Sequence, residues 1–145
     1  MVFLSSYSAV AKLSYLCWDS VLLGTVSWKV MRFGELEDDH LNPTDFSNEV
    51  NKIYPVEVGL HAALVIWLFV HWEITLLLMN VPYLAFTIMM FLDKSYHVDA
   101  ATVYTKDFKK GAKQKVLISL IFFGIMFCVY LASMVSTLIA VGSKK

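Results

Sequence analysis

The sequence predicts an all-α integral membrane protein, a bundle of four transmembrane helices formed by residues 1–145 as one domain. Of the 145 residues, 58% are hydrophobic and 17% are charged, whereas soluble domains are about 45–50% apolar and about 25% charged. The charged residues gather in two segments, 34–54 and 93–115, which separate long apolar stretches. Because the formal net charge is zero, no basic surface for nucleic acid is expected.

The longest apolar stretch, residues 55–92, sets the predicted topology. As a single helix it would extend about 57 Å, nearly twice the hydrocarbon core of a bilayer. We therefore expect two crossings, at about 55–71 and 74–92. The turn is expected where polar residues and a proline cluster: His71, Glu73, Asn80 and Pro82. The alternative is one long tilted helix, which would give three crossings and place the two charged segments on opposite sides of the membrane.

The first and last crossings are predicted at about 9–33 and 116–141. The last stretch carries no charge, whereas the first is interrupted by Lys12, Asp19 and Lys29. The two lysines lie near its ends and can extend toward the head groups. Asp19 lies too deep for that, so we expect it to be buried against protein rather than lipid.

Four crossings put both termini on one side of the membrane and both charged segments on the other. Segment 93–115 carries six lysines against three aspartates, and an excess of lysine favours the cytosol. The acidic segment 34–54 then also faces the cytosol, and both termini face the lumen.

Small residues recur at every fourth position of the last predicted helix: Gly124, Cys128, Ala132, Ser136 and Ala140. Such a stripe allows close approach of helix backbones, which lipid-embedded helices use to associate. Packing within the bundle and docking of another membrane protein are both open. Aromatic residues on the opposite side are expected to face lipid: Phe122, Phe123, Phe127 and Tyr130.

Four polar residues at membrane depth could form hydrogen bonds between helices, recognise a partner, or act as an acid–base or metal site. They are Glu57 and His61, one helical turn apart, and His71 and Glu73 near the expected turn. The sequence contains no zinc-protease motif, nucleophile elbow or phosphate-binding loop, so we expect no cofactor and no metal. The two cysteines, Cys17 and Cys128, are expected to be free thiols.

The segment FGELEDDHLNPTD, residues 33–45, resembles the signature of the cornichon family. The matching positions in and after it are Phe33, Leu36, Asp39, Asn42, Pro43, Asp45, Pro55, Glu57, His61, Asn80 and Pro82. Because proline excludes the α region at the residue before it, Asn42–Pro43 is expected to stop a helix.

The resemblance implies a non-enzymatic, multi-pass protein of the endoplasmic reticulum and Golgi membranes. Cornichons bind transmembrane client proteins and recruit the COPII coat for export, and some remain with glutamate receptors as auxiliary subunits. The family's coat-binding motif corresponds here to Val103, Tyr104, Thr105 and Lys106, where Thr105 departs from the pattern. The leading hypothesis is thus a cargo receptor. An auxiliary channel or transporter subunit is the alternative, and an intramembrane enzyme is a third.

Overall fold

The structure, a computed structural model, describes residues 2–143, with side chains for residues 7–105 and 110–143. It consists of four α-helices. They are α1 (Val2–Glu37), α2 (Pro43–Val70), α3 (Ile74–Leu92) and α4 (Lys106–Gly142). All four contain an apolar segment long enough to cross a membrane.

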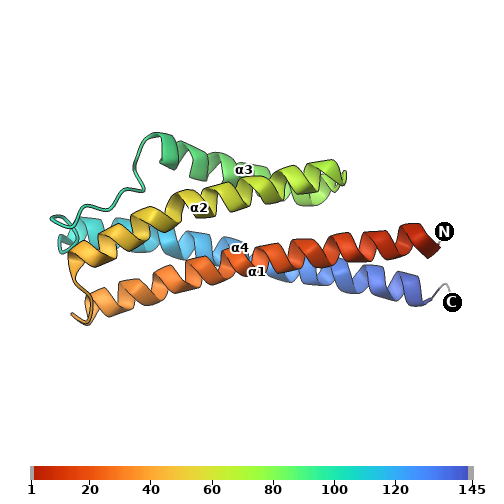
Figure 1. The fold of residues 1–145 in the computed structure, drawn as a ribbon, viewed down its shortest axis with the longest axis horizontal. Coiled ribbons are helices and arrows are strands. Elements are labelled where there is room, and N and C mark those ends of the chain that lie inside the picture. Colours follow the sequence, from red (N-terminus) through yellow and green to blue (C-terminus); the bar gives the residue numbers. More distant parts are fainter. Residues whose placement is uncertain (1, 144–145) are drawn as a thin grey trace.

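Figure 1 shows how the helices are arranged. α1 and α4 lie side by side along the whole molecule, α2 packs on α1, and α3 folds back along α2. The α1–α2 and α3–α4 connections meet at one end, and both chain termini lie at the other. The α2–α3 turn ends short of the termini, so the bundle contains only α1 and α4 at that extremity.

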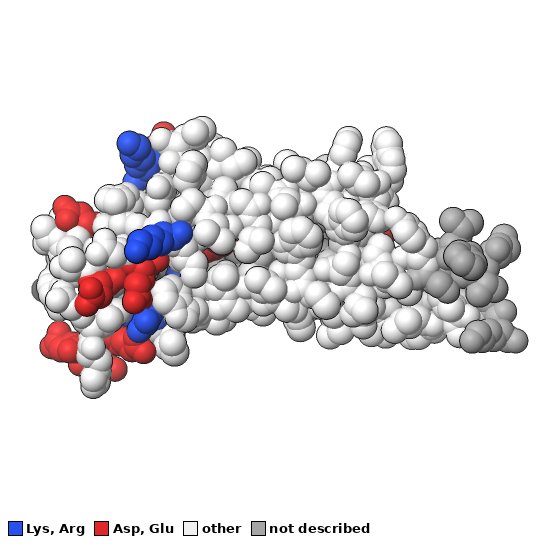
Figure 2. All heavy atoms as spheres, in the orientation of Figure 1, with Lys and Arg blue, Asp and Glu red and all other residues white. Residues whose placement is uncertain are grey.

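Charged side chains gather at the end that carries the two connections, and a long surface with almost no charged residues separates this end from the termini (Figure 2). The helical spans beneath that surface are apolar. We call the end that carries the connections the charged end, comprising residues 29–57 and 93–115. The turn at residues 71–73 breaks the central apolar stretch into two antiparallel helices. The four-crossing prediction is therefore confirmed, and the three-crossing alternative is wrong.

The helices extend further than the sequence predicted. α1 continues to Glu37, α2 begins at Pro43 rather than near residue 55, and α4 begins at Lys106 rather than near residue 116. The 36 residues of α1 would measure about 54 Å, well beyond the hydrocarbon thickness. Charged residues can remain helical once the chain leaves the apolar layer. Hydrophobicity therefore located the membrane-spanning segments but not the ends of the helices.

Asn42 and Pro43 begin a helix, and the expectation that they stop one is wrong. The Oδ1 atom of Asn42 accepts a hydrogen bond from the Thr44 backbone N–H at 3.0 Å, and Pro43 is the first helical residue. Proline holds Asn42 in an extended conformation (φ −68°, ψ 135°), which suits an N-cap. α1 has already ended at Glu37, followed by Asp39 in the left-handed region (φ 56°).

The α2–α3 turn is tighter than expected. It comprises His71, Trp72 and Glu73, with Trp72 at φ 55°. Asn80 and Pro82 lie inside α3 and take no part in the turn. Pro82 is tolerated there because it removes only one backbone hydrogen bond from a helix whose neighbouring bonds remain.

Two hydrophobic clusters hold the bundle together. The larger, at membrane level, joins α1, α2, α3 and α4 and includes Tyr15, Leu22, Leu64, Leu68, Leu76, Tyr83, Phe123, Met126 and Tyr130. Phe123 and Tyr130 are each 1% exposed, so the expectation that they face lipid is wrong. The smaller lies in the charged end and comprises Phe33, Leu36, Phe46, Val50, Val98 and Val103.

Candidate functional site

The charged end is a folded layer rather than two loose loops. Phe46, Val50 and Tyr54 follow one another at four-residue spacing on α2 and are buried, which places them on one helix face. Phe46 packs edge-on against Phe33 of α1, with ring centroids 4.8 Å apart. This spacing is visible in the sequence, but the polar and charged residues between its members concealed the helix.

Ion pairs on the surface of this layer join the helices. Arg32 lies 2.6 Å from Glu35 of the same helix and 3.0 Å from Glu49 of α2. Lys113 of α4 lies 2.9 Å from Glu37 of α1. The family-motif residues divide by role in this layer. Phe33 and Leu36 are buried in the smaller cluster, whereas Asp39, Asn42 and Asp45 are exposed.

The Asn51 side chain helps to fasten the α3–α4 connection to α2. The Asn51 amide donates to the carbonyl of Val98 at 2.9 Å and accepts from the Val98 backbone N–H at 2.8 Å. Val98 and Val103, which belong to this connection, are themselves buried. Sequence reasoning missed Asn51, because both of its hydrogen bonds are made to Val98, which is 47 positions away.

The residues that correspond to the coat-binding motif are not presented as one exposed strip. Val103 is fully buried, while Tyr104 is 51% exposed and Thr105 is exposed. Lys106 begins α4, and its side chain lies outside the described residues. Tyr104 is therefore the aromatic residue of this stretch that a partner can reach from solvent.

Lys29 and Glu57 form an ion pair buried between α1 and α2. Each residue is 3% exposed, and the Lys29 ammonium lies 5.7 Å from the centre of the Tyr54 ring. The expectation that Lys29 extends toward the head groups is wrong. The partner, Glu57, is 28 positions away in the sequence and could not be inferred without knowing that α1 and α2 pack together.

A polar chain crosses the core from α2 through α3 to α4. His61 Nε2 lies 3.1 Å from Asn80 Oδ1, and Asn80 Nδ2 donates to the Tyr130 hydroxyl at 2.8 Å. All three residues are 1% exposed. Glu57 and His61 thus form contacts between helices, which was one of the interpretations left open.

α3 and α4 are joined largely by long side chains. The Tyr83 hydroxyl donates to Ser119 Oγ at 2.6 Å, and the Tyr83 ring stacks on Phe122 with centroids 4.0 Å apart. Backbone contacts in the described residues instead pair α1 with α4, α2 with α3 and α1 with α2. We call the side-chain-bridged interface between α3 and α4 the α3–α4 seam.

Asp19 is fully buried, which confirms that it faces protein. Neither carboxyl oxygen has a hydrogen-bond partner among the described residues. The hydroxyl of Tyr15, one turn away on α1, is also buried without a partner in that part of the chain. Asp19 is therefore a costly residue that contributes no interhelical bond in this conformation.

The residues considered for an enzyme site lie at two levels. His71 contacts the Tyr7 hydroxyl at 3.1 Å and the Trp67 carbonyl at 2.9 Å. Ten residues of helix separate it from His61, or about 15 Å. No group of three or more metal-ligating side chains occurs among the described residues. The histidines and glutamates do not converge.

The small-residue stripe lies on the outside of the bundle. Cys128, Ala132, Ser136 and Ala140 are exposed, and Gly124 is half-buried with open space where a Cβ would be. The interpretation that the stripe packs inside the bundle is wrong, because Phe123, Met126 and Tyr130 occupy the inner face. Cys17 and Cys128 are both exposed, free thiols.

The fold and its buried contacts define a small polytopic membrane protein with one charged end. A family model described as cornichon protein matches residues 10–131. The chain is also 30% identical over 110 residues to the ER-derived vesicles protein erv14 of Schizosaccharomyces pombe, covering 76% of this chain and 79% of that protein. This protein belongs to the cornichon family.

Two further relatives agree with this assignment. An uncharacterised protein of Schizosaccharomyces pombe is 31% identical over 107 residues, which cover 74% of this chain and 78% of the relative. The protein cornichon homolog 2 of Oryza sativa subsp. japonica is 26% identical over 119 residues, covering 81% and 77% of the two chains.

Proposed function

We propose that this protein is a transmembrane cargo receptor that selects membrane-protein clients in the endoplasmic reticulum for COPII-dependent export to the Golgi. The observation that carries the proposal is the cornichon match across residues 10–131, together with similarity to a protein named for ER-derived vesicles. Its place is in the membranes of the secretory pathway, and its role is to bind clients rather than to catalyse a reaction.

The orientation follows from the charges. Both connections lie at the charged end (Figure 1), and the segment 93–115 contributes six lysines to it. An excess of lysine in short loops favours the cytosolic side. In the proposal the charged end faces the cytosol and the coat, and the termini face the lumen.

The outer face of α4 is the proposed client surface. Its exposed residues at four-residue spacing are small, including Ala132 and Ser136, so a client helix can approach the α4 backbone closely. A surface of this kind selects by shape and van der Waals contact, which suits a receptor that accepts several different transmembrane segments.

The proposed coat surface is the charged end. Tyr104 is half-exposed, and Asp39 and Asp45 are exposed on the neighbouring α1–α2 connection. Val103 anchors this stretch from below, since it is buried against the smaller cluster. We expect Tyr104→Ala to lower packaging of the protein into COPII vesicles in a reconstituted budding reaction, while Tyr7→Ala at the opposite end leaves packaging unchanged.

Loss of the protein tests the cargo role. In cells that lack it, we expect a defined set of membrane proteins to accumulate in the endoplasmic reticulum while other secretory proteins mature normally. Quantitative proteomics of purified endoplasmic-reticulum membranes measures this. Normal export rates for every membrane protein would overturn the proposal. So would stable residence of this chain beside a channel at the cell surface.

A second experiment tests the client surface. Ala132→Leu combined with Ser136→Leu places bulk on an exposed face, so the bundle should fold normally while client co-purification falls several-fold. Val135→Leu is the matched control, because Val135 is 43% exposed on the same helix but off the stripe. Equal client recovery from the double variant and the control would remove the stripe from the proposal.

A further inference from the structure

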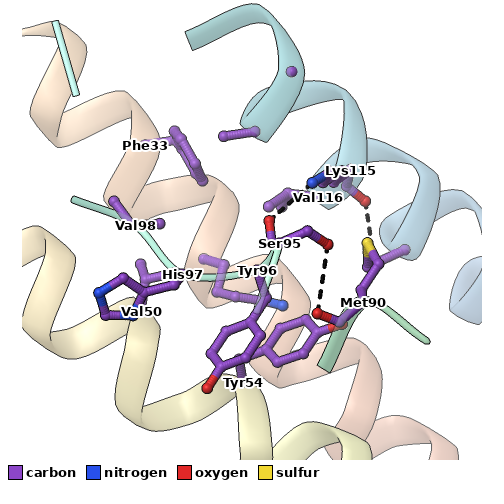
Figure 3. Close-up of a pocket in the computed structure, with 14 residues that line it drawn as sticks. Phe33, Val50, Tyr54, Met90, Ser95, Tyr96, His97, Val98, Lys115 and Val116 are labelled. Atoms are coloured by element: carbon purple, nitrogen blue, oxygen red, sulfur yellow. Dashed lines mark hydrogen bonds between the residues drawn. The ribbon is translucent and has the colours of Figure 1, made fainter. Parts of the chain in front are cut away.

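The charged end encloses a cavity of about 280 Å³. Figure 3 shows it between α1, α2, α4 and the chain that follows α3. Phe33 lies on one side of the cavity, and the rings of Tyr54 and Tyr96 lie on another (Figure 3). The two tyrosine rings stack with centroids 4.4 Å apart and an interplanar angle of 5°, so this wall of the cavity is formed by aromatic rings.

Two lysines line the cavity, but within the described part of the chain only one of them, Lys29, is paired with a carboxylate. Lys29 is neutralised by Glu57 behind it. The Lys115 ammonium donates to the Ser95 carbonyl at 2.9 Å, and no carboxylate of a described side chain lies within ion-pair distance of it. No described acidic side chain lines the cavity. Lys115 therefore leaves a net positive charge facing the space.

The position of the cavity restricts its ligand. It lies inside the charged end, next to the apolar spans of α3 and α4, which contribute Met90 and Val116 to its lining. This is the level at which lipid head groups meet a helix bundle. The cavity lining combines this cationic group with the apolar side chains of Met90 and Val116. A ligand that fits carries an anionic group on an apolar body. Cationic pockets between transmembrane helices on the cytosolic side are suited to anionic head groups.

We propose that this cavity binds one anionic phospholipid of the surrounding leaflet. Its phosphate lies against Lys115, and the adjoining glycerol region lies against the Tyr54–Tyr96 wall. The volume is below that of a complete lipid, so the acyl chains leave the cavity along the α3–α4 seam. There the helices are bridged by Tyr83 and Ser119 rather than by close backbone contact.

Native mass spectrometry of the purified full-length protein tests the site. The protein is exchanged into detergent with equal amounts of phosphatidylserine, phosphatidylinositol and phosphatidylcholine, and retained lipid is counted per chain. We expect one anionic lipid per protein, preferred over phosphatidylcholine. Lys115→Gln should reduce that preference about fivefold, the effect of one lysine near an anionic lipid.

Two further variants separate the site from general effects. Gly111→Leu fills the cavity from α4, where a Cβ meets nothing within 4 Å, and leucine also favours the helix more than glycine does. It should abolish retention of the single lipid without loss of folding. Lys113→Gln is the matched control, because Lys113 is exposed two residues away, pairs with Glu37 and lies outside the cavity.

The outcomes are decisive in each arm. Equal retention of anionic and zwitterionic lipid would overturn the proposal, as would the same loss from Lys113→Gln as from Lys115→Gln. Inorganic phosphate and glycerol phosphate form a competing arm. If millimolar amounts of either displace the lipid completely, the site recognises free phosphate and the assignment to a bilayer lipid is wrong.

Discussion

Glu57 and Asp19 are both buried carboxyl residues at membrane-helix positions, but their surroundings differ. Glu57 is 3% exposed and pairs with Lys29 across the α1–α2 interface. Asp19 is 0% exposed, and its oxygens have no partner among the described residues. The acid in the charged end is thus part of the scaffold, whereas the acid in the middle of α1 is buried without a hydrogen bond from any described residue to offset its desolvation.

The comparison shows that a buried charge stabilises a helix pair only while its partner remains. Removing one member of a buried pair leaves an uncompensated charge, whereas replacing both with apolar residues is often neutral. An ionisable residue kept in a membrane helix at a cost in stability marks a functional position. For Asp19 this is a hypothesis, and its stability cost is measurable.

The largest expected effect is that of Lys29→Ala. It leaves Glu57 buried without a cation, and we expect the free energy of unfolding to fall by about 3–5 kcal/mol. Denaturant titration of the purified protein in mixed micelles measures the loss.

The paired replacement Lys29→Met with Glu57→Leu is the control for that variant. It removes both charges and keeps similar volumes, so stability should return close to that of the wild-type protein. A double variant as unstable as Lys29→Ala alone would show that packing, rather than charge balance, decides this interface.

A smaller loss is expected from Asn80→Leu. Asn80 is the only described link between His61 and Tyr130 in the polar chain, so its removal leaves two buried groups without that partner. We expect a loss of about 1–3 kcal/mol. Asn80→Asp or Asn80→Gln should recover part of this loss. If the leucine variant were as stable as the wild-type protein, the hydrogen bonds of the polar chain would not contribute to bundle stability.

Asp19→Leu should act in the opposite direction. Leucine branches at Cγ as aspartate does and, although it is larger, needs no hydrogen bond, so the free energy of unfolding should rise by about 1 kcal/mol. Asp19→Asn keeps the polar character and should gain less. A stabilised Asp19→Leu variant that no longer exports clients would support a functional role, whereas destabilisation would reveal a partner for this carboxyl group.

The smallest effect is expected at the exposed pair of Lys113 and Glu37, whose side chains are 60% and 40% exposed. Water and salt screen such a pair. Lys113→Gln should leave the unfolding transition unchanged within error at physiological salt. A loss comparable to that of Lys29→Ala would contradict the distinction between buried and exposed pairs that the comparison draws.

Several features of the site were within reach of the sequence. The burial of Asp19 and the turn at His71–Glu73 follow from the cost of placing polar groups in lipid. The partner of Lys29, the two contacts of Asn51 and the outward direction of Ala132 were not predictable. Each depends on which helices are neighbours and on their rotation, and small side chains allow either an inner or an outer position.

The sequence by itself determined the four apolar crossings and the shared end of the two charged segments, because hydrocarbon thickness fixes helix length and charge is excluded from lipid. Only the tertiary structure decided where the helices end, which face of α4 is open, and that Lys115 faces a cavity. These features depend on contacts between residues far apart in the sequence, because the neighbouring helices decide which face of each helix is buried and which is exposed.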